Sequence, residues 1–198
     1  MTAILVAYAT NAGSTEEVAK AVAEELGKNG AQATVRRIDE VSSLEGYDAV
    51  VVGAPMIMGW HREAVKFIKA HEAALSTLPT AYFIMAMSLT QSGEGSIQGT
   101  PLTIDPRLAK PPKNAGRLGF KERYALPAKY VRPVLQAAPR VKPVSVAIFG
   151  GRLDLFRLSI WQRLFVMLVI QAQPGEFRNW PFIRQWAAGL YLTDLRDK

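Results

Sequence analysis

The chain has 198 residues, of which 49% are hydrophobic and 21% charged, as is typical of one soluble globular domain. It has no cysteine, which excludes disulfides, thiolate metal sites, iron–sulfur clusters and a cysteine nucleophile. There are only two histidines, so a histidine-rich metal site is excluded too, and we expect no metal centre.

The net charge of +7 is unevenly distributed along the chain. Residues 1–90 carry 7 Lys/Arg against 10 Asp/Glu, whereas residues 91–198 carry 17 against 7. A basic half of this kind is either a solvated surface without a partner or a face that meets anions, such as acidic substrates or anionic lipid. Nucleic acid is less favoured as a partner, because no nucleic-acid-binding motif accompanies the charge.

Strands and helices alternate through the first half of the sequence. Apolar runs predict strands at residues 3–8, 33–38, 48–53 and 80–87, and periodic apolar residues predict helices at 14–26 and 63–75. Strands that are joined by helical crossovers form a parallel, doubly wound sheet.

The second half predicts one more strand and two more helices. We expect a helix at residues 122–138 that is kinked or started late by Pro127, and a fifth strand at 144–149. A last helix has Asn179 as its expected N-cap and Pro181 in its first turn. The expected fold is therefore a single α/β domain with a doubly wound five-stranded parallel sheet and helices on both faces.

Two segments interrupt this alternation. Residues 91–121 are rich in Gly, Pro, Lys and Ser, and predict an inserted basic loop that is either functional or disordered. Residues 154–172 predict an extra apolar helix, whose most apolar stretch, Leu164 to Ile170, is far shorter than the roughly 20 residues of a membrane-spanning helix. The apolar N-terminus lacks a basic start and is interpreted as a first strand rather than a signal peptide.

The strongest motif follows the first strand and opens a helix: Thr10, Asn11, Ala12, Gly13, Ser14 and Thr15. Hydroxyls and backbone N–H groups at a helix N-terminus form a cradle for a phosphate. Neither the G-x-x-x-x-G-K-[ST] nor the G-x-G-x-x-G pattern is present, which disfavours a nucleoside triphosphate and a dinucleotide. The alternative is a plain helix cap, because Ser, Thr and Asn cap helices in many proteins.

Two further loops follow the third and fourth strands: Pro55, Met56, Ile57, Met58, Gly59 and Trp60, then Ser88, Leu89 and Thr90. Ligands of open α/β sheets bind at the carboxyl ends of the strands, and the first of these loops supplies apolar and aromatic faces for a ring system. The alternatives are that the Met and Trp residues pack in the core, that His61 is a surface or capping histidine, and that Ser88 and Thr90 merely form a turn.

The loop at residues 10–15 resembles the flavodoxin signature (S/T)-x-x-G-x-T, and Tyr47 to Pro55 is similar to the flavodoxin segment that ends the third strand. The resemblance covers roughly residues 1–90, and more weakly 122–150 and 180–195. It implies a flavodoxin-like fold that binds FMN, with the phosphate at residues 10–15 and the isoalloxazine ring at residues 55–60 and 88–90.

One branch of the flavodoxin-like families is the most similar, the flavodoxin-type, quinone-dependent protoporphyrinogen oxidases. The similarity lies in Gly53 to His61, Phe67 to His71 and Trp161 to Ile170. It implies an FMN-dependent oxidoreductase that moves electrons from a reduced, porphyrin-type substrate through FMN to a quinone. It also implies a cytoplasmic protein, for which peripheral contact with the inner face of the cell membrane is left open. The chain departs from this branch at residues 91–121, where its basic loop is longer.

An electron-carrier flavodoxin without a substrate of its own is the main alternative. Such carriers are acidic around the flavin, whereas this chain has a sequence pI of about 9.8. A flavin-binding relative without enzymatic activity is a third alternative that the sequence leaves open.

Overall fold

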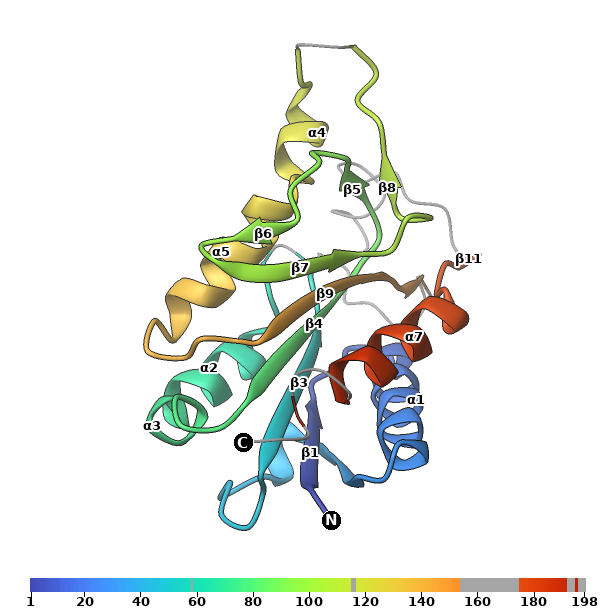
Figure 1. Cartoon of the computed structure of the whole chain (residues 1–198). Coiled ribbons are helices and arrows are strands. Elements are labelled where there is room, and N and C mark those ends of the chain that lie inside the picture. Colours follow the sequence, from blue (N-terminus) through green and yellow to red (C-terminus); the bar gives the residue numbers. More distant parts are fainter. Residues whose placement is uncertain (58, 115–116, 154–174, 192–194, 196–198) are drawn as a thin grey trace.

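The computed structural model describes residues 1–57, 59–114, 117–153, 175–191 and 195. The five predicted strands are all present and form a parallel sheet in the order β2-β1-β3-β4-β9, which confirms the predicted doubly wound α/β fold (Figure 1). Their bounds are β1 (Ala3–Tyr8), β2 (Gln32–Arg37), β3 (Ala49–Pro55), β4 (Thr80–Ala86) and β9 (Ser145–Gly150).

Helices cover both faces of this sheet (Figure 1). One face is covered by α1 (Ser14–Lys28) and α7 (Trp180–Leu190), and the other by α2 (Arg62–Ala70), α3 (Glu72–Leu75) and α5 (Pro127–Ala137). Successive strand residues point to opposite faces, so the central strands contribute side chains to two separate hydrophobic cores, one on each face of the sheet. Leu5 and Val50 belong to the core under α2 and α5, whereas Val6 and Val51 belong to the core under α1 and α7.

The segment at residues 91–121, expected as an inserted loop, contains regular structure. It contributes β6 (Ser96–Ile97), β7 (Thr100–Ile104), β8 (Ala109–Lys110) and the start of α4 (Phe120–Tyr124). β7 pairs in parallel with β9 and β6 pairs antiparallel with β7, so in the described part of the chain the sheet has seven strands rather than five. The added strands cover an edge of β9 that would otherwise present unpaired backbone groups.

Two of the expected helices are divided. The helix predicted at residues 63–75 is interrupted at His71, and the one predicted at 122–138 is interrupted at Leu126, which is extended (φ −68°, ψ 139°). A residue that precedes proline is disfavoured from the helical region, so Pro127 starts a new helix instead of continuing α4.

The last helix begins as predicted, but its cap differs. Asn179 stands at the N-cap of α7 and Pro181 lies in the first turn, yet the Asn179 side chain makes no capping bond. Its Nδ2 donates instead to Oδ1 of the buried Asp105 over 3.0 Å, so a tertiary partner has replaced the local one.

The extra helix expected at residues 154–172 lies outside the described residues. The chain on either side of it forms a short antiparallel pair, β10 (Arg152–Leu153) with β11 (Gly175–Glu176). Within the described ranges, no helix combines the length and the apolar character that a bilayer crossing requires.

Candidate functional site

The three predicted loops lie at one edge of the sheet. They follow β1, β3 and β4, which are neighbours in the sheet and run in parallel, so their carboxyl ends coincide. Backbone bonds continue the pairing into the loops: Ala9 N–H donates to the Gly53 carbonyl over 3.0 Å, and Met56 N–H to the Met85 carbonyl over 2.8 Å. The structure thus brings the predicted phosphate loop and the predicted ring loops together.

The phosphate loop turns sharply into α1 at Gly13. Gly13 is the N-cap residue with φ 84°, a left-handed conformation that glycine adopts without strain. Its N–H donates to Thr10 Oγ1 over 2.9 Å, which folds the loop over the start of the helix. Because Thr10 accepts in this bond, its hydroxyl proton is left to donate to a ligand.

Thr15 carries the most informative polar group of the loop. Its side chain is completely buried, and Oγ1 has no hydrogen-bond partner. A buried hydroxyl without a partner costs the fold about 1–3 kcal/mol, so such an atom calls for an explanation. The N–H groups of Ser14, Thr15 and Glu16 lie in the first turn of α1, where the helix offers them no carbonyl and its dipole favours an anion. Together these groups fit a bound phosphate.

The loop after β3 packs tightly against the protein. Trp60 and Met56 are 7% and 8% exposed, and the indole Nε1 of Trp60 donates to the Ala54 carbonyl over 3.2 Å. The Trp60 ring also lies against Tyr82, with ring centroids 5.6 Å apart. These contacts agree with the core-packing alternative for Trp60 and Met56.

The tip of this loop is more open. Pro55 and Ile57 are partly exposed, and Ile57 N–H bonds the carbonyl of Gly59, whose φ of 116° closes the turn. Met58 lies outside the described residues. The contacts of residues 55–60 with a flavin ring remain predictions.

The loop after β4 is hydrogen-bonded to residues that come later in the chain. Leu89 and Thr90 form the short strand β5 (Leu89–Thr90) and are buried, and Thr90 Oγ1 donates to the Glu122 carbonyl over 2.9 Å. The Tyr130 hydroxyl donates to the Ser88 carbonyl over 3.1 Å. Burial raises the pKa of Tyr130 well above its usual 10, so the phenol stays a neutral donor. Ser88 is the exposed residue of the three.

A family model described as the flavodoxin domain matches residues 5–178. The chain belongs to the flavodoxin-domain family. Members of this family bind FMN, and FMN is the cofactor of this protein. The predicted phosphate loop fits the cofactor, because the unpartnered hydroxyl of Thr15 and the first turn of α1 supply donors where the FMN phosphate requires them. In the described stretches of the chain, no three acidic or histidine side chains gather as a metal site.

Two known proteins show how this flavodoxin-domain chain compares with its relatives. It is 24% identical to protoporphyrinogen IX dehydrogenase (quinone) of Escherichia coli strain K12, over 96% of each chain. Its fold is similar to that of a short-chain flavodoxin associated with a non-canonical PDU bacterial microcompartment, with a TM-score of 0.50 and 16% identity. That comparison covers 98% of this chain and 99% of the other, and it shows the fold.

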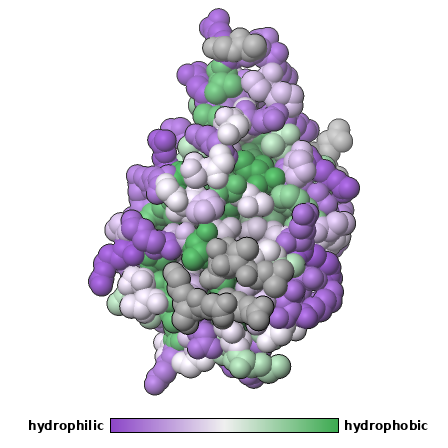
Figure 2. Space-filling model, in the orientation of Figure 1, coloured by the Kyte–Doolittle hydropathy of each residue, from purple (hydrophilic) through white to green (hydrophobic). Residues whose placement is uncertain are grey.

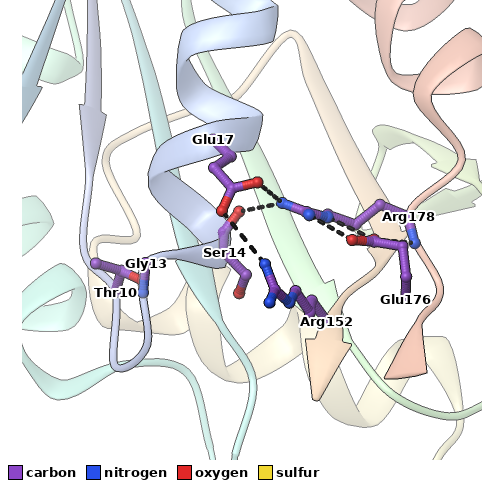
Figure 3. A network of polar contacts seen from close by, with 7 residues as sticks. All are labelled: Thr10, Gly13, Ser14, Glu17, Arg152, Glu176 and Arg178. Carbon is purple, nitrogen blue, oxygen red and sulfur yellow. Dashed lines mark hydrogen bonds and ion pairs between the residues drawn. The ribbon is translucent and has the colours of Figure 1, made fainter. Parts of the chain in front are cut away.

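Sequence reasoning missed a basic residue beside the phosphate loop. Arg178, whose side chain is 3% exposed, reaches the first turn of α1, where Nη1 donates to Glu17 Oε2 over 2.8 Å and to the Ser14 carbonyl over 3.3 Å (Figure 3). It also forms a two-pronged ion pair with Glu176 and lies over the Trp180 ring, 4.5 Å from its centroid. Arg152 approaches the same Glu17 carboxylate from β10, at 3.9 Å.

This network ties the phosphate loop to a distant part of the chain. Arg178 and Glu17 are 161 residues apart, so no local motif could have indicated the pair. The only sign of Arg178 in the sequence is its position directly before Asn179, the expected cap of the last helix. The guanidinium bonds a carbonyl and a carboxylate of the helix, and therefore acts on the loop by fixing α1.

His61 links the phosphate loop to the first ring loop. It is the N-cap of α2, where Nδ1 accepts from the Glu63 N–H over 3.3 Å, so the capping interpretation is confirmed. Its Nε2 lies 3.2 Å from Asn11 Oδ1. Since Nδ1 accepts, the proton of the neutral ring is on Nε2 and is donated to Asn11. Burial lowers the pKa of His61, which favours this neutral form.

Proposed function

We propose that this flavodoxin-domain protein is an FMN-dependent oxidoreductase that takes electrons from a porphyrinogen-type substrate and delivers them to a quinone. The observation that carries the proposal is the extent of its similarity to the Escherichia coli protoporphyrinogen IX dehydrogenase. That similarity spans 96% of both chains, and so is not confined to one part of the fold.

The proposed reaction balances without a metal. FMN supplies two-electron redox chemistry when it is bound. In each cycle the substrate gives up two electrons and two protons, and the quinone takes up the same number and becomes a quinol. The residues of the chain bind and orient: Thr10 and Thr15 donate to the phosphate, and residues 55–60 and 88–90 border the ring.

The charge distribution supports an anionic substrate. Ten exposed Lys/Arg residues lie from Asp105 to Lys142. This segment contacts the loop at residues 88–90 through Glu122 and Tyr130, whereas Arg140 lies beside Glu72, before the start of β4. A porphyrinogen carries carboxylate side chains, which such a surface attracts over about 10 Å at 0.1 M salt. The same charge disfavours an acidic carrier that docks on basic partners.

An anaerobic assay tests the proposal. FMN-loaded protein is mixed with protoporphyrinogen IX and a water-soluble quinone, and porphyrin fluorescence is followed together with quinone absorbance; protein stripped of FMN is the control. We expect porphyrin to form only with FMN-loaded protein, with matching loss of quinone. The proposal is wrong if no porphyrin forms while the reduced protein gives its electrons only to a protein acceptor, which is the behaviour of a carrier.

A further inference from the structure

A basic projection stands at the end of the molecule where the carboxyl ends of the strands lie. Figure 1 shows α4 and the chain around β8 extending beyond the sheet at this end, and Figure 2 shows hydrophilic residues covering much of it. We call this surface the basic tip and define it by five exposed cations and one aromatic residue: Lys110, Lys113, Arg117, Lys121, Arg123 and Phe120.

The cations of the basic tip have no ion-pair partners among the described residues. The acid among them, Glu122, is engaged by the backbone: its two carboxylate oxygens accept from the N–H groups of Lys113 (2.7 Å) and Gly119 (2.6 Å). These bonds hold the pKa of Glu122 below its usual range. The carboxylate of Glu122 is therefore bonded within its own loop and does not pair with the neighbouring cations. These cations are left available to an anion outside the protein.

An exposed phenyl group stands among these cations. Phe120 is 73% exposed, and among the large apolar side chains of the described residues only Met1 and Phe177 are exposed as well. The charge of an acidic ligand accounts for the cations but does not by itself account for an exposed phenyl ring at the same place. Cations that surround an apolar side chain are instead typical of surfaces that bind the headgroup region of an anionic bilayer.

The basic tip is fixed to a loop of the candidate site. β8 pairs with β5, with Leu89 opposite Ala109 and Thr90 opposite Lys110, and Gln91 N–H donates to the Lys110 carbonyl over 2.8 Å. The residues at the root of the tip are thus hydrogen-bonded to the loop predicted to border the flavin ring. Any surface on which the tip rests is brought next to that loop.

We infer that the basic tip docks the protein on an anionic lipid bilayer, with its cations against lipid phosphates and Phe120 in the headgroup region. This docking goes beyond the proposed function, because it requires turnover of neither a porphyrinogen nor a quinone. It would place the edge of the candidate site at the surface of the bilayer.

Vesicle flotation with the FMN-loaded full chain tests the docking. The vesicles contain equal amounts of phosphatidylglycerol and phosphatidylcholine, or phosphatidylcholine alone. The test variant carries Lys110→Gln, Lys113→Gln and Arg117→Gln. The matched control carries Lys69→Gln, Arg132→Gln and Lys142→Gln, which have the same net charge change at exposed positions outside the tip. A third variant, Phe120→Ser, keeps all charges.

We expect the wild type to float with the anionic vesicles at low salt and not with phosphatidylcholine alone. A basic residue near a charged bilayer contributes about 1 kcal/mol, about fivefold in partitioning, so the test variant should bind about 100-fold more weakly. The control should stay within about threefold of the wild type, because its three positions lie on α2, on α5 and after α5, outside the tip. Phe120→Ser should bind about tenfold more weakly while keeping its salt dependence.

The inference is overturned if the test variant binds anionic vesicles as well as the control does. It is equally overturned if the wild type binds no vesicles, or if the test variant keeps its vesicle binding but loses turnover of an anionic substrate, which would assign the tip to that substrate. Because flotation needs no turnover, these results are independent of whether the proposed function is correct.

Discussion

The phosphate loop and the basic tip both present polar groups that have no partner in the described protein, but the two regions differ in burial. Thr15 Oγ1 is fully buried, whereas the five cations of the tip are exposed. A buried hydroxyl without a bond costs the fold free energy, while an exposed cation is solvated by water at no such cost. An unpaired group is therefore strong evidence for a ligand when it is buried, and weak evidence when it is exposed, unless another feature such as Phe120 accompanies it.

The same contrast applies to ion pairs and gives the largest expected effect. Arg178→Ala removes a guanidinium that is 3% exposed and bonded to two carboxylates, whereas Arg37→Ala removes one that is 54% exposed and paired with Asp39. We expect the free energy of unfolding to fall by about 3 kcal/mol for Arg178→Ala and by less than about 1 kcal/mol for Arg37→Ala. Urea denaturation measures both, and equal losses would break the comparison.

Two buried threonines provide the next test. Thr15 and Thr80 are both fully buried, but the Thr80 hydroxyl bonds the carbonyls of Leu75 and Leu78. In the FMN-free protein, Thr80→Val should lower the free energy of unfolding by about 1 kcal/mol, because a made bond is lost. Thr15→Val should leave it unchanged or raise it, since the substitution removes an unpaired hydroxyl. Thermal denaturation reports the sign, and a clear loss in Thr15→Val would mean that its hydroxyl is already bonded.

A smaller effect is expected from His61 as the pH falls. Burial lowers the pKa of His61 below its usual 6.5, so the unfolded chain binds more protons than the folded one between these values. The stability that depends on neutral His61 is complete above about pH 6.5 and is lost as the pH falls through the folded pKa.

The measurement compares thermal unfolding at about pH 7.5 and about pH 5.5. His61→Gln should lose less stability over this interval than the wild type. His71→Gln, which removes the ring that lies against Phe67, is the control and should keep the wild-type loss. If His61→Gln and the wild type respond alike, the cap at His61 does not control the pH dependence.

The smallest effect on stability is expected at the basic tip. Neutralising Lys110, Lys113 and Arg117 together should change the free energy of unfolding by no more than about 0.5 kcal/mol, because exposed side chains without partners contribute little. A urea denaturation curve of the triple variant provides the check. A loss of several kcal/mol would mean that these cations stabilise the fold and are not simply solvated.

The parallel sheet was predictable because its strands are apolar on both faces. β1 has the bounds that its apolar run predicts, and β3 and β4 differ from prediction by only one or two residues. β7 was missed because its sequence, with Pro101 and alternating polar residues, is not typical of a buried strand, and because its partner β9 follows about 40 residues later. Pairing across such a distance leaves no local pattern.

The candidate site was predictable where it is local. Gly13 and Thr15 were recognised because the loop, the turn and the helix start are contiguous in sequence. The choice between core packing and an exposed ring for Trp60, the diversion of Asn179 to Asp105, and the role of Arg178 were not predictable, because each depends on a partner from another element. Propensity and spacing describe an element, and tertiary contacts decide which way its side chains turn.

The central claim is that the hydroxyl of Thr15 is a ligand of the FMN phosphate. Titrating FMN-free wild type and Thr15→Val with FMN and with riboflavin, which has no phosphate, tests it most directly. A hydrogen bond to a charged group contributes about 1.5–3 kcal/mol, so Thr15→Val should bind FMN about 10- to 150-fold more weakly and riboflavin as well as the wild type does. Equal loss for both flavins, or unchanged affinity for FMN, would contradict the claim and place the phosphate elsewhere.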